Sequence, residues 1–226
     1  MSLNWKLRQL ILEKGGLPPG TIVDHDVDLS DLEHEGDIIL DEVTINGYLK
    51  IEGLRLKGVL SLKGATLLEE VDFEEDEAET ETEVGGFNLE RATVHGFCKI
   101  PDTTGEVCLA YATIDGDVYL ENRQFGGIVD CRGLKLNGSF SADAAKFASL
   151  LTIAEAAFRE QLDLDNASMV ALDMEKAVIG EDCLMRGTTI EEDFLYQGAL
   201  IKGDLDMENS EIDLLPCLTV NGSFTL

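Results

Sequence analysis

The sequence has little of three things: basic residues, aromatic residues and long hydrophobic runs. Only 17 of its 226 residues are Lys or Arg, against 45 Asp and Glu, so the formal net charge at pH 7 is −28. A surface with this charge repels the phosphates of nucleic acid and of anionic membranes, which excludes direct binding to either. Aromatic residues make up 6% of the chain, too few for a lectin-like or base-stacking surface.

No apolar run reaches the roughly 18 residues that a membrane-spanning helix needs, and the N-terminus lacks the basic start and apolar stretch of a signal peptide. The five cysteines are an odd number, and none has the CxxC or Cys–His spacing of a zinc site. We therefore expect free thiols, a cytoplasmic location, no metal and no cofactor. Hydrophobic residues still make up 44%, enough to build a core.

What the sequence does contain is a repeat of eleven residues. Between residues 43 and 67, apolar residues occur in i, i+2 pairs whose first members are 6, 5, 6 and 5 residues apart. These pairs are Val43/Ile45, Leu49/Ile51, Leu54/Leu56, Leu60/Leu62 and Ala65/Leu67. Because side chains alternate along a strand, each pair predicts a very short strand with both side chains on one face. Glycines between the pairs predict corners.

The same rhythm covers nearly the whole chain. It begins upstream at Val27/Leu29 and resumes downstream from Ala112/Ile114 to Phe224/Leu226, with one residue missing near 172. A fixed short period of this kind is typical of a solenoid. Four pairs form a coil of 22 residues, so we predict that residues 21–226 are a single all-β solenoid domain of about nine coils.

The repeat resembles that of the pentapeptide-repeat family, in which a small residue and, two positions later, a Leu or Phe recur every five residues. The pairs that match this pattern are Ala65/Leu67, Ala145/Phe147, Ala156/Phe158 and Ala199/Ile201. The resemblance implies a right-handed quadrilateral β-helix with four short faces per coil. The sequence departs from the family in its six-residue step on alternate faces, often with a large first member such as Leu49.

An amphipathic segment precedes the repeat. Residues 3–14 place apolar side chains on one helical face and end at Gly15-Gly16. That face consists of Leu3, Leu7, Leu10 and Ile11. Because an open solenoid end exposes core and unpaired strand groups, residues 1–20, including Pro18-Pro19, are predicted to be an N-terminal capping helix and linker.

Two segments interrupt the repeat. The stretch 69–83 is rich in carboxylates and has no basic residue, which predicts an acidic loop near 74–86. It lacks the DxDxDG spacing of a calcium loop, so a solvated loop is favoured over a calcium site. Residues 101–106, PDTTGE, predict a second, shorter excursion from the coils.

Few residues suggest catalysis or metal binding. His25 and His34 lie among carboxylates and could bind a metal or act as a base, but polar positions in the first coils are the favoured interpretation for these two and for His95. His34 occupies an inward position, which predicts a polar site under the cap. There is no nucleophile elbow, Walker loop or dinucleotide fingerprint. An enzyme acting on polysaccharide remains the least favoured alternative, because the basic residues are scattered.

The favoured function is a non-enzymatic protein-interaction or scaffold rod that binds an unidentified protein partner through its acidic surface. The alternative is a nucleic-acid mimic that binds a DNA-handling protein such as a topoisomerase, a role that the resemblance implies because some pentapeptide-repeat proteins bind DNA gyrase. About nine coils spaced by about 4.8 Å give a rod on the order of 43 Å long. A net charge of −28 over that length is about one charge per 1.5 Å, near the value of about 1.7 Å for duplex DNA.

A group of carboxylates in the last coils forms the candidate interaction surface. It comprises Asp182, Asp193, Asp204, Asp206 and Glu208. With 22 residues per coil, Asp182 and Asp204 should stack about 4.8 Å apart, so we expect mutual repulsion that acidification relieves.

The chain finishes on a repeat in full rhythm. An uncovered last coil, ending at Phe224/Leu226, predicts end-to-end pairing of two rods through the C-terminal coil. Among the cysteines, Cys98, Cys131 and Cys183 fall on inward positions, whereas Cys108 lies between inward residues and should face outward.

Overall fold

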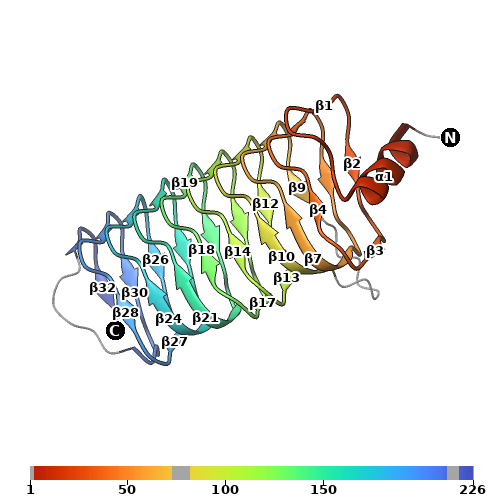
Figure 1. Ribbon diagram of the computed structural model, residues 1–226. Coiled ribbons are helices and arrows are strands. Elements are labelled where there is room, and N and C mark those ends of the chain that lie inside the picture. The colour runs from red at the N-terminus through yellow and green to blue at the C-terminus, as the bar shows by residue number, and fades with distance from the viewer. Residues whose placement is uncertain (1–2, 73–81, 213–218, 226) are drawn as a thin grey trace.

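The computed structural model describes residues 3–72, 82–212 and 219–225, which form a rod of stacked coils with helix α1 (Leu3–Lys14) at one end (Figure 1). Strands of successive coils pair in parallel, and Val27 lies opposite Leu49, one repeat of 22 residues later. The rod has about nine turns. The predicted all-β solenoid with an N-terminal helix is therefore confirmed.

Three parallel sheets run along the rod. Sheet B consists of β1 (Ile22–Val23), β5 (Thr44–Ile45), β8 (Thr66–Leu67), β11 (Thr93–Val94), β15 (Thr113–Ile114), β19 (Lys135–Leu136), β22 (Ala157–Phe158), β25 (Val178–Ile179), β29 (Leu200–Ile201) and β31 (Thr219–Val220). Sheet C consists of β2 (Val27–Asp28), β6 (Leu49–Lys50), β9 (Val71–Asp72), β12 (Cys98–Lys99), β16 (Val118–Tyr119), β20 (Phe140–Ser141), β23 (Leu162–Asp163), β26 (Cys183–Leu184), β30 (Leu205–Asp206) and β32 (Phe224–Thr225).

Sheet A covers the other two faces of each coil. It consists of β3 (Glu33–His34), β4 (Ile38–Ile39), β7 (Arg55–Ser61), β10 (Glu83–Asn88), β13 (Asp102–Thr103), β14 (Val107–Cys108), β17 (Gln124–Phe125), β18 (Val129–Asp130), β21 (Lys146–Thr152), β24 (Ser168–Asp173), β27 (Thr189–Ile190) and β28 (Phe194–Leu195). The two faces belong to one sheet because β7, β10, β21 and β24 continue around the corner between them.

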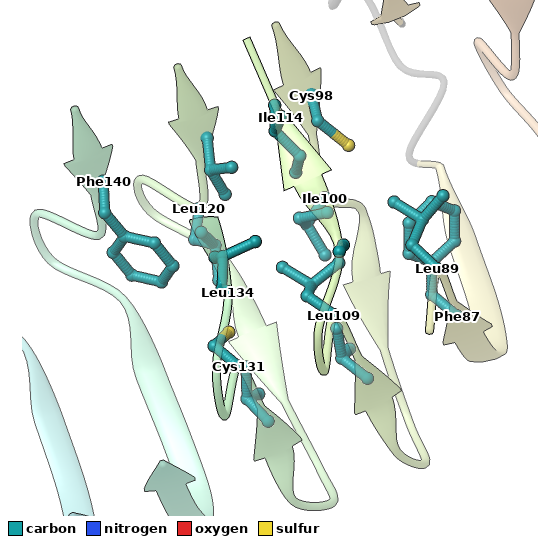
Figure 2. Close-up of a cluster of buried hydrophobic side chains, with 14 of the residues drawn as sticks. Phe87, Leu89, Cys98, Ile100, Leu109, Ile114, Leu120, Cys131, Leu134 and Phe140 are labelled. Carbon is teal, nitrogen blue, oxygen red and sulfur yellow. The ribbon is translucent and has the colours of Figure 1, made fainter. Parts of the chain in front are cut away.

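The inward side chains of all faces form one continuous core along the rod. Figure 2 shows Leu109, Leu120 and Leu134 among the side chains that fill the space between the strands. Stacking places like residues against like, so the rings of Phe125 and Phe147, one coil apart, lie 5.1 Å apart and nearly parallel. Burial of these columns supplies the main driving force for the fold.

Two kinds of corner explain the alternating steps of the repeat. At each five-residue step the chain makes a tight turn, as where the N–H of Ala65 donates to the carbonyl of Leu62 (2.9 Å). The third residue of this turn lies in the left-handed region, where glycine is favoured, as at Gly64 with φ 65°. Glu42 and Ala144 adopt φ 56° at equivalent positions, so the coil imposes this conformation on other residues too.

The six-residue steps are wider corners where backbones of neighbouring coils come close together. A Cβ atom at Gly180 would lie 1.9 Å from the carbonyl oxygen of Arg159 in the preceding coil. The middle residue of such a corner is also crowded, since a Cβ atom at Gly47, Gly138 or Gly203 would lie less than 3 Å from backbone of the preceding coil. Glycine is therefore frequent at this position, and Glu160 and Glu181 occupy it in two coils. The missing residue near 172 falls at one of them, since β24 is one residue shorter than β21 and the register shifts between Phe147 and Leu150.

Helix α1 covers the first coil as predicted, but with a different face. Ile11 is fully buried and Leu7 and Leu12 pack partly against the core. Leu10 is 43% exposed, so its predicted inward position is wrong. Successive residues of a helix are rotated by about 100°, so Ile11 and Leu12 lie to one side of Leu7 around the helix axis and Leu10 lies to the other side. The buried face includes the side of Ile11 and Leu12, which leaves Leu10 toward solvent.

After the helix, the chain joins the edge of sheet A. The N–H of Leu17 donates to the carbonyl of Ile39, and the N–H of Ile39 donates to the carbonyl of Gly15, both at 2.9 Å. These bonds satisfy edge groups of β4 that a bare solenoid end would leave unpaired.

Two predicted excursions need correction. Residues 101–106 do not leave the coil, because β13 pairs with β10 and β17. The sequence pattern missed this face since Pro101 and Thr103 take the buried positions that apolar pairs hold elsewhere. Of the predicted acidic loop near 74–86, residues 74–81 lie outside the described residues, while residues 83–86 belong to β10.

We expect Leu162→Ala to lower the free energy of unfolding by about 2–5 kcal/mol, because Leu162 is fully buried in β23 and its loss leaves a cavity. Leu195→Ala is the matched control, since Leu195 points outward from β28 and is 44% exposed. Its effect should stay within about 0.5 kcal/mol. Denaturant unfolding measures both, and equal effects would contradict the inward assignment.

Candidate functional site

Sheet C and the corners at its two edges carry many carboxylates and few cations, and we call this region the acidic side. The strands of sheet C carry Asp28, Asp72, Asp163 and Asp206 on outward positions. In each corner between sheets B and C the first residue continues the outward face of sheet B, and the last two residues belong to the acidic side. The carboxylates at these last two positions are Asp26, Glu69, Glu70, Asp117, Glu160, Glu181, Asp182 and Asp204. The corners between sheets C and A carry Asp31, Glu52, Glu121, Asp143, Asp165 and Glu208. Two rows of carboxylates therefore flank sheet C along the rod.

The structure brings four of the five predicted surface residues to this side. Asp182 and Asp204 precede β26 and β30, Asp206 lies within β30, and Glu208 lies at the following corner. Asp193 instead precedes β28 of sheet A, half a coil away. It therefore does not belong to the same surface, which the spacing of eleven residues already implied.

Asp182 and Asp204 stack as predicted, but each carboxylate also accepts a hydrogen bond from the backbone of the next coil. The Oδ1 atom of Asp182 accepts a hydrogen bond from the backbone N–H of Asp204 (2.8 Å), and Oδ1 of Asp204 accepts one from the N–H of Ser223 (2.6 Å). The same bond joins Asp117 to the N–H of Ser139 (2.8 Å). These side chains thus satisfy corner N–H groups of the next coil, and a charge-assisted bond of this kind stabilises the stack.

The lysines on the strands of sheet C are already paired with aspartates of the acidic side. Lys50 Nζ lies 3.0 Å from Asp26, and Lys99 Nζ lies 2.6 Å from Asp72. The hydrogen bond from Lys50 lowers the pKa of Asp26.

An ion pair between a buried aspartate and an exposed arginine lies further along the same side. Arg186 Nε donates to Asp165 across 2.7 Å, and Asp165 is 7% exposed. The neighbouring Asp163 is half-buried and has no such cation; burial, with the nearby carboxylates of Asp165 and Asp143, raises its pKa. Asp163 is thus a carboxylate whose charge the fold disfavours.

The histidines do not converge. His34 is half-buried in register with Leu56, as its inward position predicted. His25 Nδ1 lies 2.8 Å from the carbonyl of Asp26, and His95 Nδ1 lies 2.8 Å from Asp115. In the described part of the chain, no group of three His, Cys, Asp or Glu side chains has the arrangement of a metal site.

The cysteines divide as their positions predicted. Cys98, Cys131 and Cys183 are fully buried, and burial raises the pKa of Cys183 to about 12. Cys108 is half-buried on the outer side of β14, with a pKa that burial raises. The fifth cysteine, Cys217, lies outside the described residues.

An open hollow of about 890 Å³ lies on sheet A where β3, β7 and β10 pass each other. It is lined by Glu33, His34, Glu35, Gly36, Arg55, Leu56, Lys57, Glu83 and Thr104. Its cations are paired, since Lys57 forms an ion pair of 2.5 Å with Glu35 and Arg55 lies 3.8 Å from Glu33. The bond from Lys57 lowers the pKa of Glu35, which leaves that carboxyl without a proton to donate at neutral pH.

The helix that the structure describes is too short and too polar to cross a membrane. The chain matches no protein-family model and no curated protein. The site must therefore be interpreted from its own geometry.

The corner bonds lead to a first prediction for this surface. Asp182→Ala should lower the free energy of unfolding by about 1–3 kcal/mol, because the N–H of Asp204 loses its charged acceptor. Asp193→Ala removes the same charge from an exposed carboxylate without a described partner, and should change stability by about 0.5 kcal/mol at most. If Asp182→Ala instead stabilises the protein, repulsion outweighs the hydrogen bond.

A second prediction concerns pH. Because the folded pKa of Asp163 lies above the ordinary value of 3.8, ionisation of Asp163 destabilises the fold at neutral pH, and this cost disappears as the pH falls toward that value. Asp163→Asn, which retains an acceptor for the N–H of Asp165, should therefore melt above the wild type at pH 7. The difference should shrink at pH 4. Thermal melts at both values measure it, and a difference that does not depend on pH would contradict the prediction.

Proposed function

We propose that this protein is a non-enzymatic, pentapeptide-repeat-like interaction rod whose acidic side binds a cationic surface of a partner protein. The observation that carries the proposal is the imbalance of charge on that side. Its two corner rows present carboxylates in many of the coils, while Lys50, Lys99 and Arg186 are already paired with neighbouring aspartates. A partner must therefore bring the positive charge, and complementary fields would accelerate its association.

Rigidity supports the same proposal. The acidic side is built on ten paired strands, and the corner aspartates Asp26, Asp117, Asp182 and Asp204 are bonded to the backbone of the next coil. A surface held this way presents fixed charges, so that little conformational entropy is lost on binding. The hollow on sheet A supports the same proposal, because both of its cations are held in ion pairs with Glu33 and Glu35.

Nucleic-acid mimicry is the second candidate, favoured by the two rows that flank sheet C. Duplex DNA also presents two rows of negative charge, at about one charge per 1.7 Å of axis. The partner would then be a DNA-handling protein such as a topoisomerase. We propose a cytoplasmic location for the encounter, which the free thiols of Cys98, Cys108, Cys131 and Cys183 support.

Two matched variants test the proposal. One neutralises the acidic side with Glu52→Gln, Glu121→Gln, Glu181→Gln and Glu208→Gln. The other removes the same charge elsewhere, with Glu106→Gln, Glu175→Gln, Glu191→Gln and Glu192→Gln. Partners cross-linked in cells are identified by mass spectrometry, and their affinity for each purified variant is measured. We expect about tenfold weaker binding for the first variant only.

Equal binding by both variants would exclude the acidic side as the contact surface. Competition separates the two candidates. Duplex DNA should displace the rod from its partner if the rod mimics nucleic acid, and should leave the complex intact if the partner binds through another surface. A purified type II topoisomerase is a direct probe for the first outcome.

A further inference from the structure

Sheet B differs in charge from the rest of the rod. The first residue of each of its strands points outward, and none is a carboxylate. These residues are Ile22, Thr44, Thr66, Thr93, Thr113, Lys135, Ala157, Val178, Leu200 and Thr219. The chain has 45 acidic residues, so a column of ten outward positions that contains no acidic residue is a distinct surface.

The residues that follow these strands form a second outward column, in which the charges are separated. In the N-terminal half the column is Asp24, Asn46, Leu68, His95 and Asp115. In the C-terminal half it is Asn137, Arg159, Gly180, Lys202 and Asn221. Sheet B thus carries carboxylates only at its N-terminal half, and Lys135, Arg159 and Lys202 only at its C-terminal half.

These three cations are available for binding. All are exposed, and none forms an ion pair with a described residue, in contrast to Lys50 and Lys99 on the acidic side. The carboxylates of the other half are held in place: Asn46 donates to Asp24 (2.8 Å) and Asn137 donates to Asp115 (2.8 Å).

Exposed apolar side chains lie in the same half as these carboxylates. Ile22 is 64% exposed and Leu68 is 43% exposed. A partner that covers sheet B would therefore remove apolar surface from water as well as pair its charges.

We infer that sheet B is the contact surface for a second copy of this chain, with the two rods antiparallel about a two-fold axis. In that arrangement the N-terminal half of each sheet faces the C-terminal half of the other. Asp24 and Asp115 of each copy then face the half of sheet B that carries the other copy's cations. The two-fold axis repeats this pairing of opposite charges in the second half of the contact. The contact is self-complementary and closes at two copies.

The alternative of sheet B against the acidic side of another copy is less favourable. Such a contact uses two different surfaces, so each copy in a pair still has one of the two surfaces free and the assembly continues to grow. It would also bring the corner row at Glu160 and Glu181, which borders sheet B, close to further carboxylates.

The dimensions predict a weak dimer. Ten strands at about 4.8 Å give a face about 45 Å long, and two outward columns make it about 10 Å wide. About 450 Å² per partner is below the roughly 800 Å² of a standard stable interface. The flanking acidic corners oppose association further, so the dimer should form only at high protein concentration.

Charge reversal provides the test. Variant one reverses the cations with Lys135→Glu, Arg159→Glu and Lys202→Glu, and variant two reverses the carboxylates with Asp24→Lys and Asp115→Lys. We expect the wild type to dimerise in sedimentation equilibrium at high micromolar concentration, and each variant alone to remain monomeric. An equimolar mixture should restore the dimer, because each half of the contact again joins opposite charges.

Controls make each outcome decisive. Lys146→Glu reverses an exposed lysine of sheet A that forms no ion pair with a described residue, and it should leave the dimer intact. The variant neutralised on the acidic side should do the same. Circular dichroism confirms that every variant is folded. A monomeric wild type overturns the inference, and so does a mixture that stays monomeric. Dimers that survive both reversals, as in end-to-end pairing through the C-terminal coil, overturn it too.

Discussion

The parallel hydrogen bonds between successive coils are the interaction on which the rest of the structure depends. They hold neighbouring backbones at strand spacing, so every residue lies above its equivalent in the next coil. Inward, this produces columns of buried side chains. Outward, it produces columns of like or unlike charge. A column of outward side chains stabilises the rod where residues in neighbouring coils carry opposite charges, as Lys50 and Asp26 do.

The two corner types follow from the same constraint. A coil can close only if the chain turns sharply four times, and it does so alternately by a tight left-handed turn and by a wider corner. The tight turn tolerates Glu42 and Ala144, whereas the wide corner at Gly180 has no room for a Cβ atom. Aspartates at the wide corners satisfy the next coil's N–H groups. The carboxylates therefore contribute to the fold as well as to its surface charge.

The sequence predicted the coil length, the inward residues and the capping helix because hydrophobic periodicity reports directly which side chains are buried. It did not predict the coil face at 101–106, since Pro101 and Thr103 are buried without being part of the apolar pattern. It also missed the bonds of Asp182, because a side chain's hydrogen-bond partner depends on backbone geometry that spacing does not encode. The position of Asp193 and the charge separation on sheet B could have been found by writing the chain in rows of 22.

All described departures from the regular coil length fall on or beside sheet A. The chain has six more residues between β9 and β10 than between β6 and β7, since Asp72 and Glu83 are 11 positions apart and their equivalents Lys50 and Arg55 are 5 apart. The turn before β13 is shortened, and β10 and β24 each lack one residue. Sheets B and C keep an unbroken order of ten strands through these changes. Insertions and deletions are thus confined to sheet A and the turns beside it, a region that we call the seam, while the strands of sheets B and C keep a constant spacing. Foreign peptides grafted at this seam would leave the spacing on those sides undisturbed.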